Sequence, residues 1–398
     1  MLPLLLLASC ARVETYVEYV ARSVSKLFMA DADLANALAN AGEPLLTMEQ
    51  LAPLASANAQ FLDDVESSFG DAKMPSAFAP IAVPLLVQFV RDWTAEGQRM
   101  RSLTYQPIVE ALVPFLLGRG HGRGESGGAP RVLVPGSGTG RLVYMLAERL
   151  HGAHIIALDP DVHAQRAAAF MLAGGDLSSS SSGKAGEETS ASSQPLLPAT
   201  IYPSIHISSN WAKSAHRLAA VQVPDMPVEA LRRVAASSNL TYAYASLEDG
   251  WDVDEWEPSQ QADGRTRRRD FDAVGTCFVL DVLGDIRGSL RALHDMLRPT
   301  RGLWANLGPL AYPERTDGLS SPTAGGGGSM SMGRAVLTAA HQLALVRAAG
   351  FEIIEQRMVE GCEYNELPHR LERTVRTCLF FLARPGEMAS VQVGTNGE

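Results

Sequence analysis

The sequence predicts an α/β fold: a Rossmann-like sheet of seven strands, the last one antiparallel, preceded by an N-terminal helical region. From Arg131 onward, short β-branched runs alternate with apolar helical patterns, which is typical of a parallel sheet with helices on both faces. The first of these runs breaks into glycines directly before a helical pattern. Two further apolar runs close the chain with no helical pattern between them, which indicates an antiparallel hairpin.

Residues 1–120 form the predicted helical region. Apolar residues recur at helical spacing in Val13–Phe28, and two more helices are expected over 83–93 and 105–117. Pro107 fits the first turn of the last of these, where a missing N–H costs nothing. A glycine-rich stretch, 118–130, separates the helices from the predicted sheet.

The sheet region, 121–385, is predicted element by element. The expected strands are Val132–Val134, Ile155–Leu158, Leu240–Tyr244, Asp272–Val279, Gly302–Leu307, Phe351–Met358 and Thr377–Ala383. The expected helices are Arg141–Leu150, Val162–Leu172, Gly288–Leu297 and Ala335–Ala349, the last ended by Gly350. Polar, low-complexity composition predicts disordered insertions near 176–197, 257–269 and 314–333, and 386–398 as a tail.

Composition excludes several classes of function. The net charge of −10 provides no basic field, so we expect no nucleic-acid partner. Four cysteines without a C-x-x-C pair predict neither a metal site nor a disulfide framework and fit a reducing compartment. No apolar run approaches the length of a membrane-spanning helix, about 18 residues or more, so we expect no membrane partner. We therefore expect a cytoplasmic protein, with a nuclear location and a homodimer left open.

The glycine loop, Gly136 to Gly140, is the strongest local signal. A strand that ends in glycines before a helix presents backbone N–H groups to a polar or anionic cofactor. Glycine is required because a Cβ would block close approach and left-handed dihedrals. The spacing of Gly136, Gly138 and Gly140 is G-x-G-x-G rather than the dinucleotide G-x-G-x-x-G. It therefore favours S-adenosylmethionine over a nicotinamide cofactor.

Asp159 ends the second predicted strand, 19 residues after Gly140. A carboxylate at this point can accept hydrogen bonds from both ribose hydroxyls of a nucleoside cofactor. The alternative is that Asp159 caps the following helix, with Pro160 in the first helical position. One side chain could serve both purposes.

Seven blocks distributed along the chain form a recognisable set: Val87–Trp93, Thr104–Val109, Val132–Leu142, Ile201–Asn210, Asp272–Asp281, Leu297–Tyr312 and Cys378–Pro385. The most specific combination is Q-F-V-R-D-W, T-C-F-V-L-D and W-A-N-L-G-P-L. Together the blocks resemble the carnosine N-methyltransferases, a family of S-adenosylmethionine-dependent enzymes with the class I methyltransferase fold. Their order and spacing agree with the family from about residue 85 to 385.

The resemblance implies a cofactor site between the N-terminal helices, acting as a lid, and the sheet domain. Gln88 and Arg91, one helical turn apart, would reach over S-adenosylmethionine, and Arg91 could pair with its methionine carboxylate. The alternative for Arg91 is a surface ion pair with Asp92. Cys277 carries over as a residue lining the cofactor, which is compatible with a buried strand position.

The sequence differs from the family in the segment that would bind adenine. The family has Gly-Asp-Phe after its third strand, and this chain has Ala245-Ser246-Leu247. We expect Leu247 to pack on adenine and Ser246 to be a weaker polar partner than an aspartate. Glu248 or Asp249 could take the aspartate's place after a small shift.

For the reaction, the resemblance implies methyl transfer to an imidazole nitrogen of carnosine, giving anserine, or of a related histidine-containing dipeptide. Asp281 would be the catalytic carboxylate, bonded to the other ring N–H so that the nucleophilic nitrogen keeps its lone pair. The alternative for Asp281 is a cap of the helix that begins near Asp285.

Tyr312, Tyr364 and His206 are the further expected substrate contacts, and a core role for His206 is equally compatible with the sequence. Two family substrate positions differ, because Pro313 stands in place of a histidine and Arg376 in place of a tyrosine. Three alternatives therefore stay open: a protein-histidine methyltransferase, another small-molecule N-methyltransferase, or a homologue that keeps the fold without catalysis.

Overall fold

A computed structural model describes most of the sheet and of the N-terminal helices. The described residues are 15–28, 32–42, 45–67, 79–119, 129–175, 196–207, 209–248, 270–311, 336–363, 367 and 369–386. The predicted insertions near 257–269 and 314–333, residues 176–195 of the first insertion, and the tail beyond Gly386 lie outside these residues.

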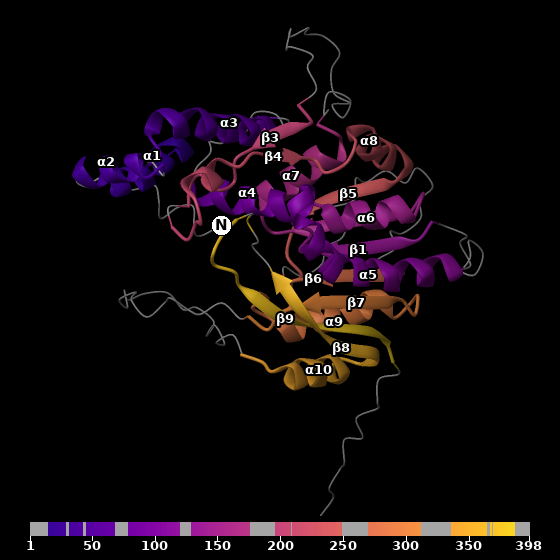
Figure 1. Cartoon of the computed structure of the whole chain (residues 1–398). Coiled ribbons are helices and arrows are strands. Elements are labelled where there is room, and N and C mark those ends of the chain that lie inside the picture. Colours follow the sequence, from indigo (N-terminus) through magenta and orange to yellow (C-terminus); the bar gives the residue numbers. More distant parts are fainter. Residues whose placement is uncertain are drawn as a thin grey trace, which may run out of the picture.

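The main sheet has seven strands in the order β5-β2-β1-β6-β7-β9-β8 (Figure 1). Neighbouring strands are parallel from β5 to β7, whereas β9 runs antiparallel between β7 and β8. The predicted Rossmann-like sheet with its last strand antiparallel is therefore confirmed. The strands are β1 Arg131–Pro135, β2 His154–Asp159, β5 Asn239–Tyr244, β6 Ala273–Cys277, β7 Leu303–Gly308, β8 Phe351–Glu363 and β9 Val375–Pro385.

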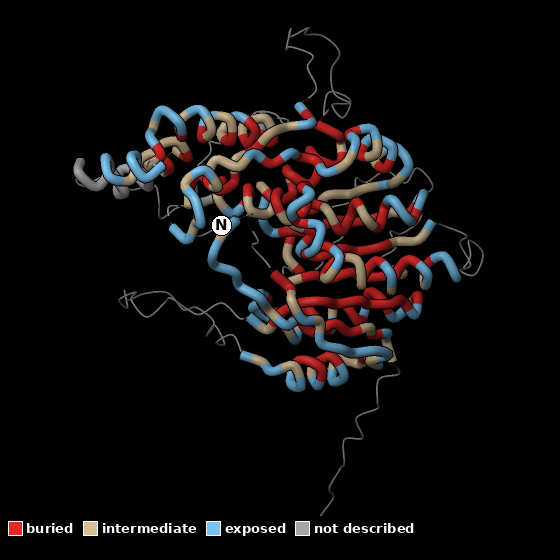
Figure 2. The backbone as a smooth tube through the Cα atoms, viewed as in Figure 1, coloured by how far each residue is buried: buried red, intermediate tan, exposed pale blue. Residues whose placement is uncertain are grey.

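The side chains of alternate strand residues belong to two separate hydrophobic clusters, one on each face of the sheet. In β1, Val132 and Val134 point into one cluster, and Leu133 points into the other. Helices cover both faces, and the central strands are almost wholly buried (Figure 2). The helices after the first strand are α6 Arg141–Arg149, α7 Val162–Leu172, α8 Val228–Ser237, α9 Ile286–Leu297 and α10 Ala339–Ala348.

The N-terminal region is helical as predicted, with boundaries that differ from those expected. Helix α5 begins at Gln98, so Pro107 lies in its interior and the expected first-turn position is wrong. The helix continues through the missing N–H because its buried side packs against β6, β7 and β8. The helices are α1 Tyr16–Phe28, α2 Ala32–Asn40, α3 Met48–Ser67, α4 Ala79–Trp93 and α5 Gln98–Gly118. No described helix is both long and apolar enough to span a bilayer.

Between α7 and β5 the chain forms a small antiparallel pair, β3 Ala199–Ile201 and β4 Val221–Val223, that the sequence analysis did not predict. Each strand has only three residues, too few for alternation to be visible in the sequence. Helix α3 packs against both β3 and α7. This insert therefore joins the N-terminal helices to the sheet domain.

Gly140 provides a test of the turn that leads into α6. Its φ of +88° is left-handed, and a Cβ would lie 2.9 Å from Cβ of Ala168. Gly152 has a similar φ of +78°, with nothing within 4 Å of a Cβ. We expect Gly140→Ala to lower the free energy of unfolding by roughly 2–3 kcal/mol and Gly152→Ala by about 1 kcal/mol, because only the first adds a clash. Equal losses in urea unfolding would show that packing against α7 does not constrain the loop.

Candidate functional site

The glycine loop leaves β1 and enters α6 through three left-handed glycines. The φ angles of Gly136, Gly138 and Gly140 are +62°, +53° and +88°. L-residues rarely adopt such angles, which explains the glycines. A Cβ on Gly136 would also lie 2.5 Å from Cγ2 of Val279, in the loop after β6. The loop therefore packs closely against the carboxyl end of β6.

Gln88 and Arg91 of α4 reach this loop, and their predicted contact with S-adenosylmethionine stays a prediction. A Cβ on Gly138 would lie 3.4 Å from Oε1 of Gln88 and 3.5 Å from Nη2 of Arg91. The Gln88 amide and the Arg91 guanidinium thus face the loop backbone at Gly138, which has no side chain to separate them from it. Polar side chains of α4 therefore lie directly beside the glycine loop at Gly138.

Asp92 connects α4, α5 and the glycine loop. Nε and Nη2 of Arg91 donate to its two carboxylate oxygens at 2.7 and 2.8 Å. The Thr139 hydroxyl donates at 2.6 Å and the Tyr105 hydroxyl at 2.8 Å. The predicted alternative for Arg91, an ion pair with Asp92, is therefore present, but it is buried rather than at the surface, since the Asp92 side chain is 1% exposed.

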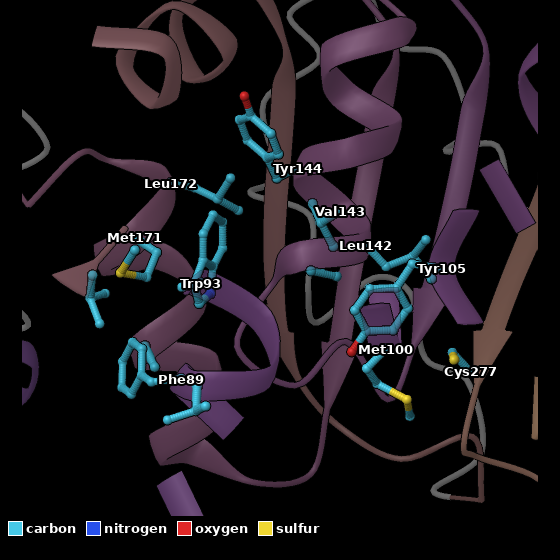
Figure 3. Packing of buried hydrophobic residues seen from close by; sticks show 14 of the residues in the cluster. Phe89, Trp93, Met100, Tyr105, Leu142, Val143, Tyr144, Met171, Leu172 and Cys277 are labelled. Atoms are coloured by element: carbon cyan, nitrogen blue, oxygen red, sulfur yellow. The ribbon is translucent and has the colours of Figure 1, made fainter. Parts of the chain in front are cut away.

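The neighbouring Trp93 forms a second link to the same loop residue. Its indole N–H donates to the Thr139 carbonyl at 2.9 Å. Figure 3 shows Trp93, Tyr105 and Cys277 among the residues of one buried hydrophobic cluster. Helix α4 is thus held to the loop by polar bonds inside an apolar cluster.

Arg101 fixes the end of α4. Its Nη1 donates to the carbonyls of Arg91 and Thr94 at 2.7 and 2.8 Å, and Nη2 pairs with Asp225 at 2.5 Å. The turn that follows requires Gly97, because a Cβ there would lie 2.0 Å from the Arg91 carbonyl oxygen. The backbone of Arg91 is therefore held as firmly as its side chain.

Asp159 ends β2 and is bonded to the glycine loop. Its Oδ2 accepts from the N–H of Gly138 at 2.8 Å and its Oδ1 from the N–H of Asp161 at 2.9 Å. Burial raises the pKa of Asp159, against the lowering effect of these two bonds. The residue that caps α7 is Asp161, so the alternative role of Asp159 as the cap is wrong. The contact of Asp159 with ribose stays a prediction.

Ser246 and Leu247 follow β5 at the same edge of the sheet. Leu247 is buried in the cluster that contains Val279, from the loop after β6. Glu248, expected as one substitute for the family's aspartate, instead accepts the N–H of Asp285 at 2.5 Å. Asp249 lies outside the described residues. Contacts of Ser246 and Leu247 with adenine stay predictions.

Cys277 is the last residue of β6, and the expected strand end at Val279 is two residues too long. The next residue, Phe278, has a φ of +60°, which ends the strand and redirects the chain. Cys277 is buried, and burial raises the pKa of its thiol. The thiol is therefore uncharged at neutral pH, and its contact with the cofactor stays a prediction.

Asp281 is a buried carboxyl group with an unusual environment. It is 4% exposed, and no described residue forms a hydrogen bond to Oδ1. Burial raises its pKa to about 6, although backbone N–H groups of Asp281 and Ala311 and the charge of Arg376 oppose the shift. Asp285 caps α9 through the N–H of Gly288, so the alternative of Asp281 as that cap is wrong.

His206 lies beside the N-terminal helices. Its Nδ1 is 3.3 Å from the hydroxyl of Tyr16, which also accepts a hydrogen bond from Asn58. Burial, reinforced by Arg217 and Arg370, lowers the pKa of His206 to about 4, so the ring is neutral at pH 7. This packing agrees with a core role, and its contact with substrate stays a prediction.

Of the other positions at which substrate contacts were expected, the structure describes only one. Tyr312, Pro313 and Tyr364 lie outside the described residues. Arg376 lies in β9, opposite Cys362 of β8 and three residues beyond the pairing of Leu379 with Gly308. It thus extends past the end of β7, on the side of the sheet where Asp281 lies.

Sequence reasoning missed the supporting residues of this site. Asp92 entered only as the alternative partner of Arg91, and Tyr105 and Thr139 were not singled out. All three lie in the motifs that carried the family resemblance, and hydroxyl or carboxylate side chains in otherwise apolar blocks were the available signal. Their mutual contacts join positions as far apart as 92 and 139, which spacing alone does not show.

Two sequence comparisons agree on the family. The model of the family named "Carnosine N-methyltransferase" matches residues 74–178 and 192–387, more than half of the chain. The carnosine N-methyltransferase of Schizosaccharomyces pombe is 26% identical over 288 residues, 72% of this chain. The Drosophila melanogaster protein named carnosine N-methyltransferase unmet is 22% identical over 334 residues, 84% of this chain.

Solved structures with a similar chain trace include two methyltransferases. The N-methyltransferase NodS of Bradyrhizobium japonicum, in complex with S-adenosyl-L-homocysteine, has a TM-score of 0.36 and 11% identity over 76% of this chain and 99% of its own. The magnesium protoporphyrin IX methyltransferase of Synechocystis has a TM-score of 0.33 and 11% identity over 86% of this chain and 99% of its own.

The match to the curated relatives is partial along their length. It covers 66% of the fission yeast protein and 61% of the fly protein. Within this chain, however, the family match spans α4, the glycine loop and every strand of the main sheet. The chain belongs to the carnosine N-methyltransferase family.

Proposed function

We propose that the chain is an S-adenosylmethionine-dependent N-methyltransferase that acts on the imidazole ring of carnosine or a related histidine-containing dipeptide. Family membership supports the reaction class. The observation that carries the proposal is Asp281, a buried carboxylate with an oxygen that no described residue bonds, in the loop after β6. Such a group destabilises a fold, and perturbed buried carboxylates concentrate at functional sites, where that cost is tolerated.

The residues around the glycine loop fit S-adenosylmethionine. The absence of a side chain at Gly138 leaves room between the loop and the polar atoms of Gln88 and Arg91. The Arg91 guanidinium would bind the methionine carboxylate, and Asp159 at the end of β2 would bind the ribose. Leu247 and Ser246 would flank the adenine, and Cys277 would line the wall between cofactor and acceptor.

S-adenosylmethionine supplies a methyl group on a sulfonium, and the transfer is an in-line displacement. The protein then mainly orients the acceptor and keeps one imidazole nitrogen unprotonated. Asp281 would accept the N–H of the other nitrogen, which fixes the tautomer and stabilises the imidazolium that forms. The charge of Arg376 lowers the pKa of Asp281 and would favour the ionised carboxylate that this role requires. The small-peptide partner, the lack of nucleic-acid and membrane partners, and the cytoplasmic location remain expectations.

The activity can be tested with labelled S-adenosylmethionine and carnosine. We expect methyl transfer to the imidazole, and we expect Asp281→Asn to reduce kcat by about 100-fold or more because the ring loses its charged partner. Asp285→Asn is the matched control. This nearby exposed residue caps α9, and asparagine caps equally well, so activity should persist.

Three outcomes would contradict this function in different ways. Methylation of histidine in lysate proteins but not in dipeptides would favour the protein-histidine alternative. Methyl transfer to another small molecule, without transfer to carnosine or a related dipeptide, would show that the proposed substrate is wrong. A wild-type protein that binds no S-adenosylhomocysteine in calorimetry would identify a homologue without catalysis.

The buried carboxylate of Asp281 is expected to lower the stability of the folded protein at neutral pH. Its folded pKa of about 6 lies above the usual value of 3.8, so the folded state binds the proton more tightly and loses stability as pH rises from about 4 to 6. We expect Asp281→Asn to raise the free energy of unfolding at pH 7 by roughly 2–3 kcal/mol while it lowers kcat as stated above. The gain should shrink towards pH 4 in urea unfolding. A variant that is destabilised at pH 7 would contradict this view of Asp281.

A further inference from the structure

We propose that Asp92 is a positioning residue for the cofactor: it orients Arg91 and joins that residue to the glycine loop. The inference rests on the proposed function, because it assumes that Arg91 binds the carboxylate of S-adenosylmethionine. It concerns a residue that would not itself touch the cofactor. Four hydrogen bonds and a side chain that is 1% exposed support it.

Every group that bonds Asp92 is a donor. Arg91 supplies two N–H groups, and Thr139 and Tyr105 supply one hydroxyl each, so both carboxylate oxygens are occupied. A carboxylate has no donor of its own when ionised and is the one side chain that accepts all four bonds. Asp92 thus acts within the protein, and a ligand would meet Arg91 instead.

The geometry of the ion pair shows which edge of the Arg91 guanidinium faces Asp92. Asp92 takes the edge of the guanidinium formed by Nε and Nη2. A guanidinium has five N–H donors, so the Nη1 end and the second Nη2 hydrogen point away from Asp92. Nη2 is also the guanidinium atom that lies nearest to a Cβ position on Gly138, at 3.5 Å. Asp92 thus holds Nη2 of the guanidinium beside Gly138 of the loop.

The charge of Asp92 is maintained in the folded protein. Burial alone would raise its pKa, but the charge of Arg91 and the hydrogen bonds from Arg91, Thr139 and Tyr105 outweigh it and lower the pKa. The pair is therefore ionised at neutral pH. An asparagine at this position would offer an NH₂ group to donors and would break the network.

Holding Arg91 in place lowers the cost of binding. A free arginine side chain loses rotamer entropy when a ligand fixes it. Here the side chain is fixed in advance by Asp92 and the backbone carbonyl by Arg101. Because Thr139 lies in the glycine loop, the same carboxylate also sets the distance between the guanidinium and the loop N–H groups.

A double-mutant cycle on the full chain tests this role, with S-adenosylhomocysteine as the calorimetric probe. We expect Asp92→Asn to weaken binding by about tenfold or more, and Arg91→Ala to weaken it similarly. In the Arg91→Ala background, Asp92→Asn should add less than about twofold, because Asp92 acts through Arg91. The KM for S-adenosylmethionine should rise in Asp92→Asn while kcat at saturation stays within about twofold.

Glu66→Gln is the matched control, because it removes another buried carboxylate that holds an N-terminal helix. Glu66 of α3 pairs with Arg166 and His163 of α7. We expect a lower Tm and unchanged binding. If Asp92→Asn does not fold, Thr139→Val replaces it, since it removes one donor and keeps the charge. It should weaken binding severalfold, and Thr139→Ser should restore it.

The outcomes separate this inference from the proposed function. A wild-type protein that does not bind S-adenosylhomocysteine would overturn both. If the wild type binds, equal effects of Asp92→Asn with and without Arg91 would overturn the positioning role alone, because the effect would then not pass through Arg91. Unchanged affinity in a folded Asp92→Asn variant would overturn it as well.

Discussion

The buried carboxylate of Asp92 is the interaction on which the site depends most. It brings α4, α5 and the glycine loop together, although Asp92, Tyr105 and Thr139 are well separated in the sequence. A carboxylate without these donors would be costly to bury, and the donors would be costly to leave unpaired. The network therefore forms as a whole and fixes the N-terminal helices relative to the sheet at the place where the cofactor is proposed to bind.

Three buried carboxylates at this edge of the sheet have different environments. Asp92 is saturated with donors and its pKa is lowered, whereas burial raises the pKa of Asp159 and Asp281. Asp159 is bonded by two backbone N–H groups, and Asp281 retains an oxygen that no described residue bonds. The three carboxylates thus differ in how fully their oxygens are hydrogen-bonded. The difference agrees with a positioning role for Asp92, a cofactor-binding role for Asp159 and a catalytic role for Asp281.

The sequence was sufficient for the fold and for the glycine loop, because both depend on local patterns. Strand alternation, left-handed glycines and Asp159 at a strand end are each visible within a few residues. It was insufficient where packing decides: the start of α5 before Pro107, the short pair β3 and β4, and the caps Asp161 and Asp285 in place of Asp159 and Asp281. The bonds of Asp92 join distant segments, so no local pattern revealed them.

The most direct test of the central claim is a crystal structure with S-adenosylhomocysteine and carnosine. The methionine carboxylate is predicted to lie on Arg91, the ribose on Asp159, and an imidazole N–H within hydrogen-bond distance of Oδ1 of Asp281, about 2.7–3.2 Å. An imidazole ring that binds away from Asp281, with the nucleoside outside the glycine loop, would contradict the claim.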